Sequence, residues 1–172
     1  MDGAMALAFL LAGLTDMGLN HCRYDGCLAE RPMQSRASVS FGNVIFQGNE
    51  VGKELYARYD LGKAYGPFQP IVGLSLSDQG TAWVGVGAAF TSTFAGGQIY
   101  TQLHLMPGVY AQGNGPNLGH TVEFRSGFEA GYQAKNGVRV GLSFDHRSNA
   151  ELSAVNPGLE TWALRVSIPL NK

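Results

Sequence analysis

Residues 122–147 read VEFRSGFEAGYQAKNGVRVGLSFDHR, and apolar and polar side chains alternate on both sides of the turn residues near the middle. Side chains of a β-strand point alternately to opposite faces, so this alternation predicts two strands that are each apolar on one face. In the first strand a mainly apolar face opposes a charged one: Val122, Phe124, Phe128, Ala130 and Tyr132 against Glu123, Arg125 and Glu129. The turn Lys135-Asn136-Gly137 between the strands favours a hairpin.

Short segments of this kind, separated by Gly, Pro, Asn and Asp, continue from about residue 35 to the end of the sequence. We count eight candidate strands: 37–47, 52–61, 67–76, 81–91, 97–106, 120–132, 137–147 and 159–170. Eight evenly spaced strands with turn residues between them are typical of a β-meander, sandwich or barrel. The sequence therefore predicts one all-β domain over residues 35–172.

The composition indicates which of these folds to expect. Charged residues make up 15% of the 172 residues, below the roughly 25% of soluble domains, and mean hydropathy is near zero. A transmembrane barrel has this composition because its apolar side chains face lipid while polar ones fill the interior. Strands of about ten residues also match the length that crosses a bilayer at a tilt. We expect an eight-stranded antiparallel transmembrane β-barrel; periodicity alone leaves a soluble sandwich or lipocalin-like barrel as an alternative.

The connections also favour a membrane barrel. The two longest links, about 107–119 and 148–158, both fall on the side expected to face outward, whereas the link after the sixth strand is a tight turn. Long outer loops and short periplasmic turns are typical of outer-membrane barrels. The links after the first and third strands are short, so the asymmetry is incomplete.

Residues 1–34 precede the first strand and contain an apolar run, ALAFLLAGL, at 6–14. This run resembles the apolar region of a secretory signal, but no Lys or Arg precedes it. We therefore expect a signal-like or periplasmic segment, or else a short buried or disordered stretch. Cys22 and Cys27, the only cysteines, could close a small disulfide in an exported protein.

Several other functions lack support in the sequence. The net charge is −1 and the basic residues are scattered, so no basic stripe suggests nucleic-acid binding. The two cysteines and four histidines show no metal-ligand spacing. We therefore expect neither a metal nor an organic cofactor.

Three polar residues lie where the predicted strands are otherwise apolar. By parity His146 and Ser148 share a face with Leu142, and Glu160 shares a face with Trp162. If 149–158 closes an antiparallel hairpin, Glu160 sits opposite or diagonal to His146. Ser148 could then attack an acyl carbonyl, His146 could accept its proton, and Glu160 could orient the imidazole. The alternative is an ordinary interfacial histidine with a chance serine and glutamate, but polar groups on a lipid-facing surface are costly without such a role.

The last third of the sequence resembles the lipid A 3-O-deacylases (PagL type). Three runs carry the resemblance: FRSGFEAGY at 124–132, VGLSFDHRSNA at 140–150 and NPGLE at 156–160. These enzymes are eight-stranded outer-membrane barrels that hydrolyse the ester-linked acyl chain at position 3 of lipid A. The matching motifs lie between about residues 120 and 170. From about residue 37 onward the number of predicted strands also agrees with the family, whereas the first thirty residues are not covered by the resemblance.

The resemblance implies roles for individual residues. The family's His-x-Ser falls on His146 and Ser148, and its acidic partner falls on Glu160. Asn149 and Asn156 match two family asparagines, and either could donate to the oxyanion, although turn formation is the alternative role of both. The predicted partners are lipid A of lipopolysaccharide and the outer membrane, with a homodimer as an alternative to a monomer. The rival functions are a non-catalytic structural or adhesive barrel and a soluble lipid-binding barrel.

Overall fold

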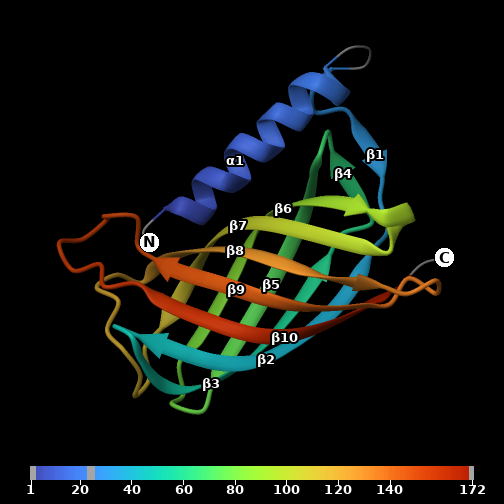
Figure 1. Cartoon of the computed structure of the whole chain (residues 1–172). Helices are drawn as coiled ribbons and strands as arrows, with labels where there is room; N and C mark the ends of the chain where they lie inside the picture. The colour runs from blue at the N-terminus through green and yellow to red at the C-terminus, as the bar shows by residue number, and fades with distance from the viewer. Residues whose placement is uncertain (1–2, 23–25, 171–172) are drawn as a thin grey trace.

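The computed structural model describes residues 3–22 and 26–170. Residues 1–2 and 23–25 of the predicted N-terminal segment, and residues 171–172 at the end of the predicted barrel domain, lie outside the described residues. A closed antiparallel barrel forms most of the molecule (Figure 1). Its strands are β2 (Arg36–Phe46), β3 (Asn49–Asp60), β5 (Phe68–Ser77), β6 (Ala82–Phe94), β7 (Ile99–Ala111), β8 (Val122–Gln133), β9 (Arg139–Ser148) and β10 (Leu159–Pro169). The barrel closes because β10 pairs with β2 and β5 pairs with β6. The predicted eight-stranded antiparallel barrel is confirmed.

The strand ends differ from the prediction mainly in β7. The predicted strand ends at 106, but β7 continues through Pro107 to Ala111, with Pro107 opposite Phe124 of β8. Proline lacks a backbone N–H and so marks a probable strand end in a sequence. Here the ladder resumes beyond it, where the Tyr110 N–H donates to the carbonyl of Thr121 at 2.8 Å. The outer loop between β7 and β8 is therefore shorter than 107–119.

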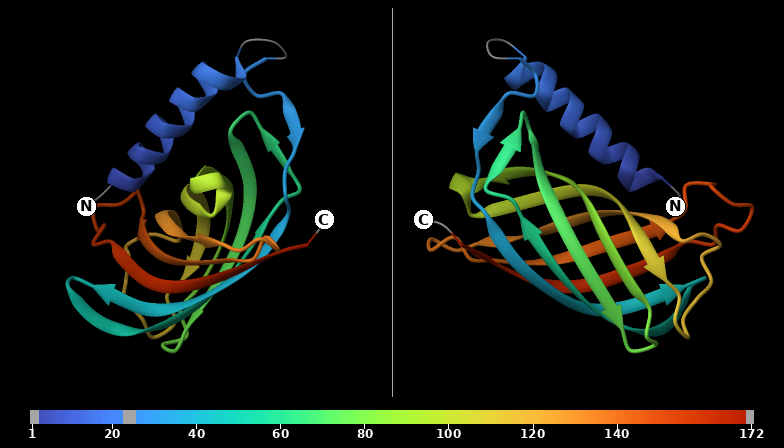
Figure 2. Two further views of the ribbon diagram at one scale, coloured as in Figure 1. Left: turned by 45° about the vertical axis from the view of Figure 1, so that its right-hand side comes forward. Right: turned by 180° about the vertical axis from the view of Figure 1, so that it is seen from behind.

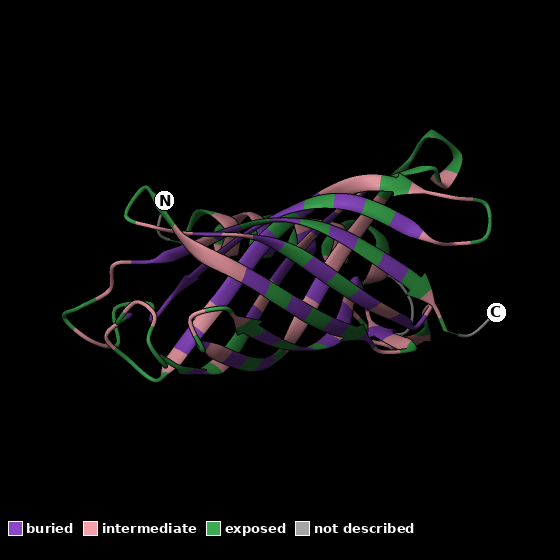
Figure 3. Ribbon diagram, turned by 90° about the horizontal axis from the view of Figure 1, so that it is seen from below, coloured by how far each residue is buried: buried purple, intermediate pink, exposed green. Residues whose placement is uncertain are grey.

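The two faces of the barrel carry opposite chemistry, visible in Figure 3 as alternating buried and exposed residues along the strands. Large apolar side chains are exposed on the outer face, including Phe41, Leu55, Leu74, Val86, Leu142 and Leu164. Charged side chains are buried inside, including Glu54, Arg58, Arg125, Glu129, Asp145 and Arg165. A soluble sandwich or lipocalin-like barrel would bury the apolar face instead, so this arrangement is that of a transmembrane barrel.

Ion pairs and aromatic rings fill the interior. Arg125 lies 2.9 Å (Nη1) from Glu54 Oε1 and 3.0 Å (Nη2) from Asp145 Oδ2. Its guanidinium stacks 3.8 Å from the ring centroid of Tyr56, beside the fully buried Trp83. An eight-stranded barrel is just wide enough for side chains to fill, and this one is filled.

The connections at the two ends differ in length. The turn between β8 and β9 is tight: the Val138 carbonyl accepts from the Ala134 N–H at 2.8 Å, and Gly137 has φ +85°. At the opposite end a long loop, residues 149–158, joins β9 to β10. The predicted tight turn and long outer loop are both confirmed.

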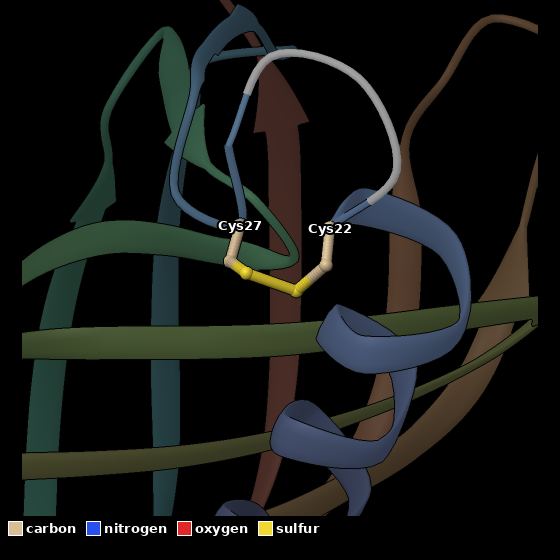
Figure 4. The surroundings of a disulfide bond; sticks show 2 residues. All are labelled: Cys22 and Cys27. Carbon is tan, nitrogen blue, oxygen red and sulfur yellow. A yellow bond between two sulfur atoms is a disulfide. The ribbon is translucent and has the colours of Figure 1, made fainter.

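An N-terminal helix lies outside the barrel (Figure 2). Helix α1 (Ala4–Asp16) packs against β6, β7 and β8, and a π-helical turn, η1 (Met17–His21), extends it. The chain then reaches β1 (Glu30–Pro32), which pairs with β4 (Lys63–Tyr65). Cys22 and Cys27 form a disulfide between the helix end and this ribbon (Figure 4). Among the described residues, no helix is long and apolar enough to cross a membrane.

Candidate active site

Strand β9 ends at Ser148, and His146 lies two residues before that end. Both residues are on the same face of the strand as Leu142. Leu142 is 65% exposed on the outside of the barrel, whereas Asp145 and Arg147, which alternate with His146 and Ser148, point inward to ion-pair partners. His146 and Ser148 are nevertheless only 3% and 8% exposed. The end of β9 therefore presents two polar groups on the outer face in a covered position.

Glu160 lies directly across the strand pair from His146. The register places them opposite each other, and His146 Nδ1 is 3.2 Å from Glu160 Oε1. The ten-residue loop between the strands returns the chain antiparallel, so two residues that are 14 apart in sequence become cross-strand neighbours. The carboxylate side chain remains 22% exposed. This contact fixes the orientation of the imidazole ring.

Gly158 supports the other side of the imidazole. Its φ is +72°, a conformation that favours glycine, and a Cβ built there would lie 2.8 Å from Cε1 of His146. Any larger residue would therefore strain the backbone and displace the ring. Gly158 was not among the predicted site residues. The available signal was its place two residues before Glu160 in an Asn-Pro-Gly turn, but its close approach to His146 depends on how the loop folds.

The two asparagines of the loop make different contacts. Asn149 is fully buried, and its side-chain nitrogen donates to the carbonyls of Leu118 at 2.9 Å and Val155 at 2.7 Å. The backbone N–H of Asn149 donates to Asn156 Oδ1 at 2.9 Å. Among the described residues the Asn156 side chain is engaged through this Oδ1 and not through its NH₂ group. Asn149 thus ties the two outer loops together, while Asn156 keeps a donor available.

A pocket of about 370 Å³ opens beside Ser148 on the outside of the barrel. It lies between the first turns of α1, the outer face of β7 and β8, and the β9–β10 loop, which run close together in Figure 1. Its lining residues are Gly3, Ala6, Leu105, Phe124, Ser126, Ser148, Ala150, Glu151 and Asn156. Most of these are apolar or small, so the pocket suits a hydrocarbon chain that ends near a hydroxyl group.

The structure thus brings together His146, Glu160 and the loop that holds Asn149 and Asn156, and it places Ser148 and Asn156 in one pocket. The residues from α1 and the pocket residues Leu105 and Phe124 were not anticipated. No group of His, Cys, Asp and Glu that could hold a metal ion occurs in residues 3–22 and 26–170.

The model of a family described as lipid A 3-O-deacylase (PagL) matches residues 38–169. The crystal structure of the outer membrane enzyme PagL superposes with a TM-score of 0.65 at 23% identity, covering 78% of this chain and 99% of that one. A de novo designed transmembrane β-barrel superposes with a TM-score of 0.59 at 11% identity, covering 81% and 98%. At these identities the superpositions show the fold alone. No curated protein sequence matches this chain.

Proposed function

This chain belongs to the lipid A 3-O-deacylase (PagL) family, and on that basis we propose that it is a serine esterase that removes the 3-O-linked acyl chain of lipid A in the outer membrane. The observation that carries the proposal is the pairing of His146 with Glu160 two residues from Ser148, beside an apolar pocket on the outer face. A nucleophile, a base and a group that orients the base are the three parts that acyl transfer needs.

Ser148 is the nucleophile in this proposal. Its Oγ attacks the ester carbonyl of the acyl chain while His146 takes the hydroxyl proton. The tetrahedral intermediate then expels the sugar oxygen, which receives that proton from His146 as it leaves. Water, activated by the same imidazole, hydrolyses the acyl-enzyme in a second step. The products are a 3-hydroxy fatty acid and lipid A that lacks one chain, with Ser148 regenerated.

Glu160 keeps His146 in the tautomer that this sequence requires. With Nδ1 facing the carboxylate at 3.2 Å, Nδ1 carries the hydrogen and Nε2 is left to accept the serine proton. The carboxylate also stabilises the imidazolium that forms during attack. Glu160 acts through His146 and touches no reacting atom.

Asn156 is the side chain that we assign to the oxyanion. It lines the pocket with Ser148, and among the described residues its side chain is engaged through Oδ1, which accepts from the Asn149 N–H, and not through its NH₂ group. Asn149 uses its side-chain nitrogen and its backbone N–H in the loop contacts described above. The contacts therefore favour Asn156 as the donor and Asn149 as the residue that holds the loop in place.

The filled interior determines the side from which the substrate comes. Buried side chains such as Arg125, Glu54 and Tyr56 occupy the barrel interior at the level of the strands, so an acyl chain has no room there. The outer face carries Ser148 and is apolar around it. We therefore infer that lipid A approaches laterally, with its acyl chain against the outer surface and its sugar near the long outer loops.

A homodimer stays a prediction.

Mass spectrometry of lipid A after incubation of lipopolysaccharide with the purified protein in detergent tests this function. The wild-type protein should remove one acyl chain and release one fatty acid, and Ser148→Ala should do neither while keeping the folded barrel's circular dichroism. Ser143→Ala is the matched control because Ser143 lies on the same strand but is buried on the inner side. An unchanged lipid A profile with wild-type protein would support a non-catalytic barrel instead. A Ser148→Ala protein as active as Ser143→Ala would rule out the proposed nucleophile.

A further inference from the structure

Helix α1 is apolar on both of its long faces. Leu7, Leu10, Leu11 and Leu14 point away from the barrel, and Leu7 and Leu11 are 57% and 60% exposed. On the opposite face Phe9 and Gly13 are buried against the barrel, and Ala6 lines the pocket beside Ser148. A helix that is apolar all round is found in an apolar environment. Here that environment is the barrel on one side and the hydrocarbon region on the other.

Three contacts fix the position of α1 across the outer face. The ring of Phe9 packs on that of Phe68 with centroids 5.4 Å apart. The backbone at Gly13 approaches Phe68 so closely that a Cβ there would lie 2.3 Å from its ring. Beyond the helix, the Cys22–Cys27 disulfide connects its end to the β1–β4 ribbon. The helix is thus held at both its middle and its end, which positions its first turns over the candidate site (Figures 1 and 2).

Those first turns complete the pocket beside Ser148. The barrel contributes Leu105 and Phe124, and the N-terminal segment contributes Ala6 of α1 and Gly3, which directly precedes the helix. Without α1 the same barrel residues would form a surface open to the bilayer. With α1 in place they form a groove whose size depends on the small side chain at position 6.

We propose that α1 is a built-in part of the acyl-chain binding site: the chain being cleaved lies between Ala6 and the Leu105–Phe124 surface, and the bulk of residue 6 limits the chain length accepted. This inference rests on the proposed esterase function for its biological meaning. The occupant is the substrate's own acyl chain because the groove is mainly apolar and its lining includes Ser148 and Asn156, beside which the ester carbonyl must lie.

The first test compares Ala6→Trp with Leu11→Trp in the full-length protein. Ala6→Trp fills the groove, whereas Leu11→Trp adds the same side chain on the exposed face of the same helix. The readout is kcat/KM on a long-chain (palmitoyl) and a short-chain (butyryl) p-nitrophenyl ester. Each methylene kept out of an apolar site costs about fourfold in binding. We expect Ala6→Trp to lower kcat/KM at least about tenfold for the palmitoyl ester and less than about twofold for the butyryl ester, and Leu11→Trp to change neither. Equal losses on both esters, or no loss on either, would overturn the proposal.

A second test needs no hydrolysis and separates this proposal from the proposed function. Ser148→Ala protein is irradiated with a palmitoyl ester that carries a photoreactive group in mid-chain, and the labelled peptides are identified by mass spectrometry. Labelling of the α1 peptide that contains Ala6, abolished by excess unlabelled ester, supports the groove even if no ester is hydrolysed. Labelling that is confined to other surfaces contradicts it. So does an intact mass showing that the protein extracted from outer membranes lacks the helix, residues 4–16.

Discussion

Neighbouring residues of β9 belong to two regions with opposite properties. Asp145 points into the barrel, where it meets Arg125 at 3.0 Å and His104 Nε2 at 2.9 Å, with Arg165 at 3.9 Å. His146, the next residue, points outward to the carboxylate of Glu160, and Ser148, two residues further on, lines an open pocket. The inner charges neutralise one another in a closed space, which makes them structural. The outer pair lies two residues from Ser148, which lines space that a substrate can enter, and this makes the outer region suited to chemistry.

The sharpest test of this contrast is His146→Ala. Loss of the base should reduce fatty-acid release from lipopolysaccharide by at least about 10³-fold, since triad members act as a unit. The urea midpoint of unfolding in detergent should fall less than on removal of the Asp145 carboxylate, because the Glu160 carboxylate that loses its partner is 22% exposed and can be solvated. His120→Ala, at an exposed histidine of the β7–β8 loop, is the control and should keep full activity. A large loss of stability in His146→Ala would remove the distinction between the two regions.

The reverse behaviour is expected of Asp145→Ala. Removing this carboxylate leaves Arg125, Arg165 and His104 buried without their shared partner, which should cost about 3–5 kcal/mol in the free energy of unfolding. Activity per folded molecule should change little because Asp145 faces away from the pocket. Urea titration gives the first quantity, and fatty-acid release normalised to the folded fraction gives the second. Full stability of Asp145→Ala would contradict the structural role of the inner cluster.

Asn156→Ala and Asn149→Ala sharpen the comparison within the outer loop. Loss of an oxyanion donor typically costs about 10²–10³-fold in kcat, so Asn156→Ala should lose that much with little change in KM. Asn149→Ala should instead lower the free energy of unfolding by about 1–3 kcal/mol, because it leaves the carbonyl of the buried Leu118 without this donor. Kinetics with p-nitrophenyl esters and urea titration separate these outcomes. The opposite pattern would exchange the two assignments.

Gly158→Ala is the smallest change with a clear expectation. The added methyl group meets the His146 ring and requires a strained backbone at φ +72°. Displacement of a catalytic group by about 1 Å costs about 10²-fold in rate, so activity should fall by up to that factor. Gly48→Ala is a matched control: it too has positive φ, +81°, but a Cβ there meets nothing. Equal activity of the two variants would show that the imidazole tolerates the methyl group.

Alternation of side chains predicted the strands because the inner and outer faces differ so strongly in polarity, and strands of about ten residues with few charges favoured a membrane barrel over a soluble one. The same parity put His146, Ser148 and Glu160 on the apolar face. It left Glu160 either opposite or diagonal to His146 across a hairpin, and the register places the two residues directly opposite. The ribbon of β1 and β4 escaped prediction because three-residue strands have no periodicity. The continuation of β7 beyond Pro107 depends on its pairing with β8. The sequence did not predict it because a proline usually marks the end of a strand.

The rest of the candidate site depends on contacts between segments far apart in the chain. The distinction between Asn149 and Asn156 rests on carbonyls of Leu118 and Val155, which only the folded loops bring near Asn149. The groove beside Ser148 includes Ala6, more than a hundred residues away, because α1 folds back over the barrel. An apolar run such as 6–14 indicates an apolar environment but not which surface it covers.

The central claim is that Ser148, activated by His146 on the outer face of the barrel, is the nucleophile. It is tested most directly by a long-chain alkyl fluorophosphonate, which forms a covalent adduct with an activated serine. Peptide mass spectrometry of the treated protein should locate the adduct on Ser148, and His146→Ala should remove it. An adduct on another serine, or labelling of Ser148 at an undiminished rate in His146→Ala, would contradict the account.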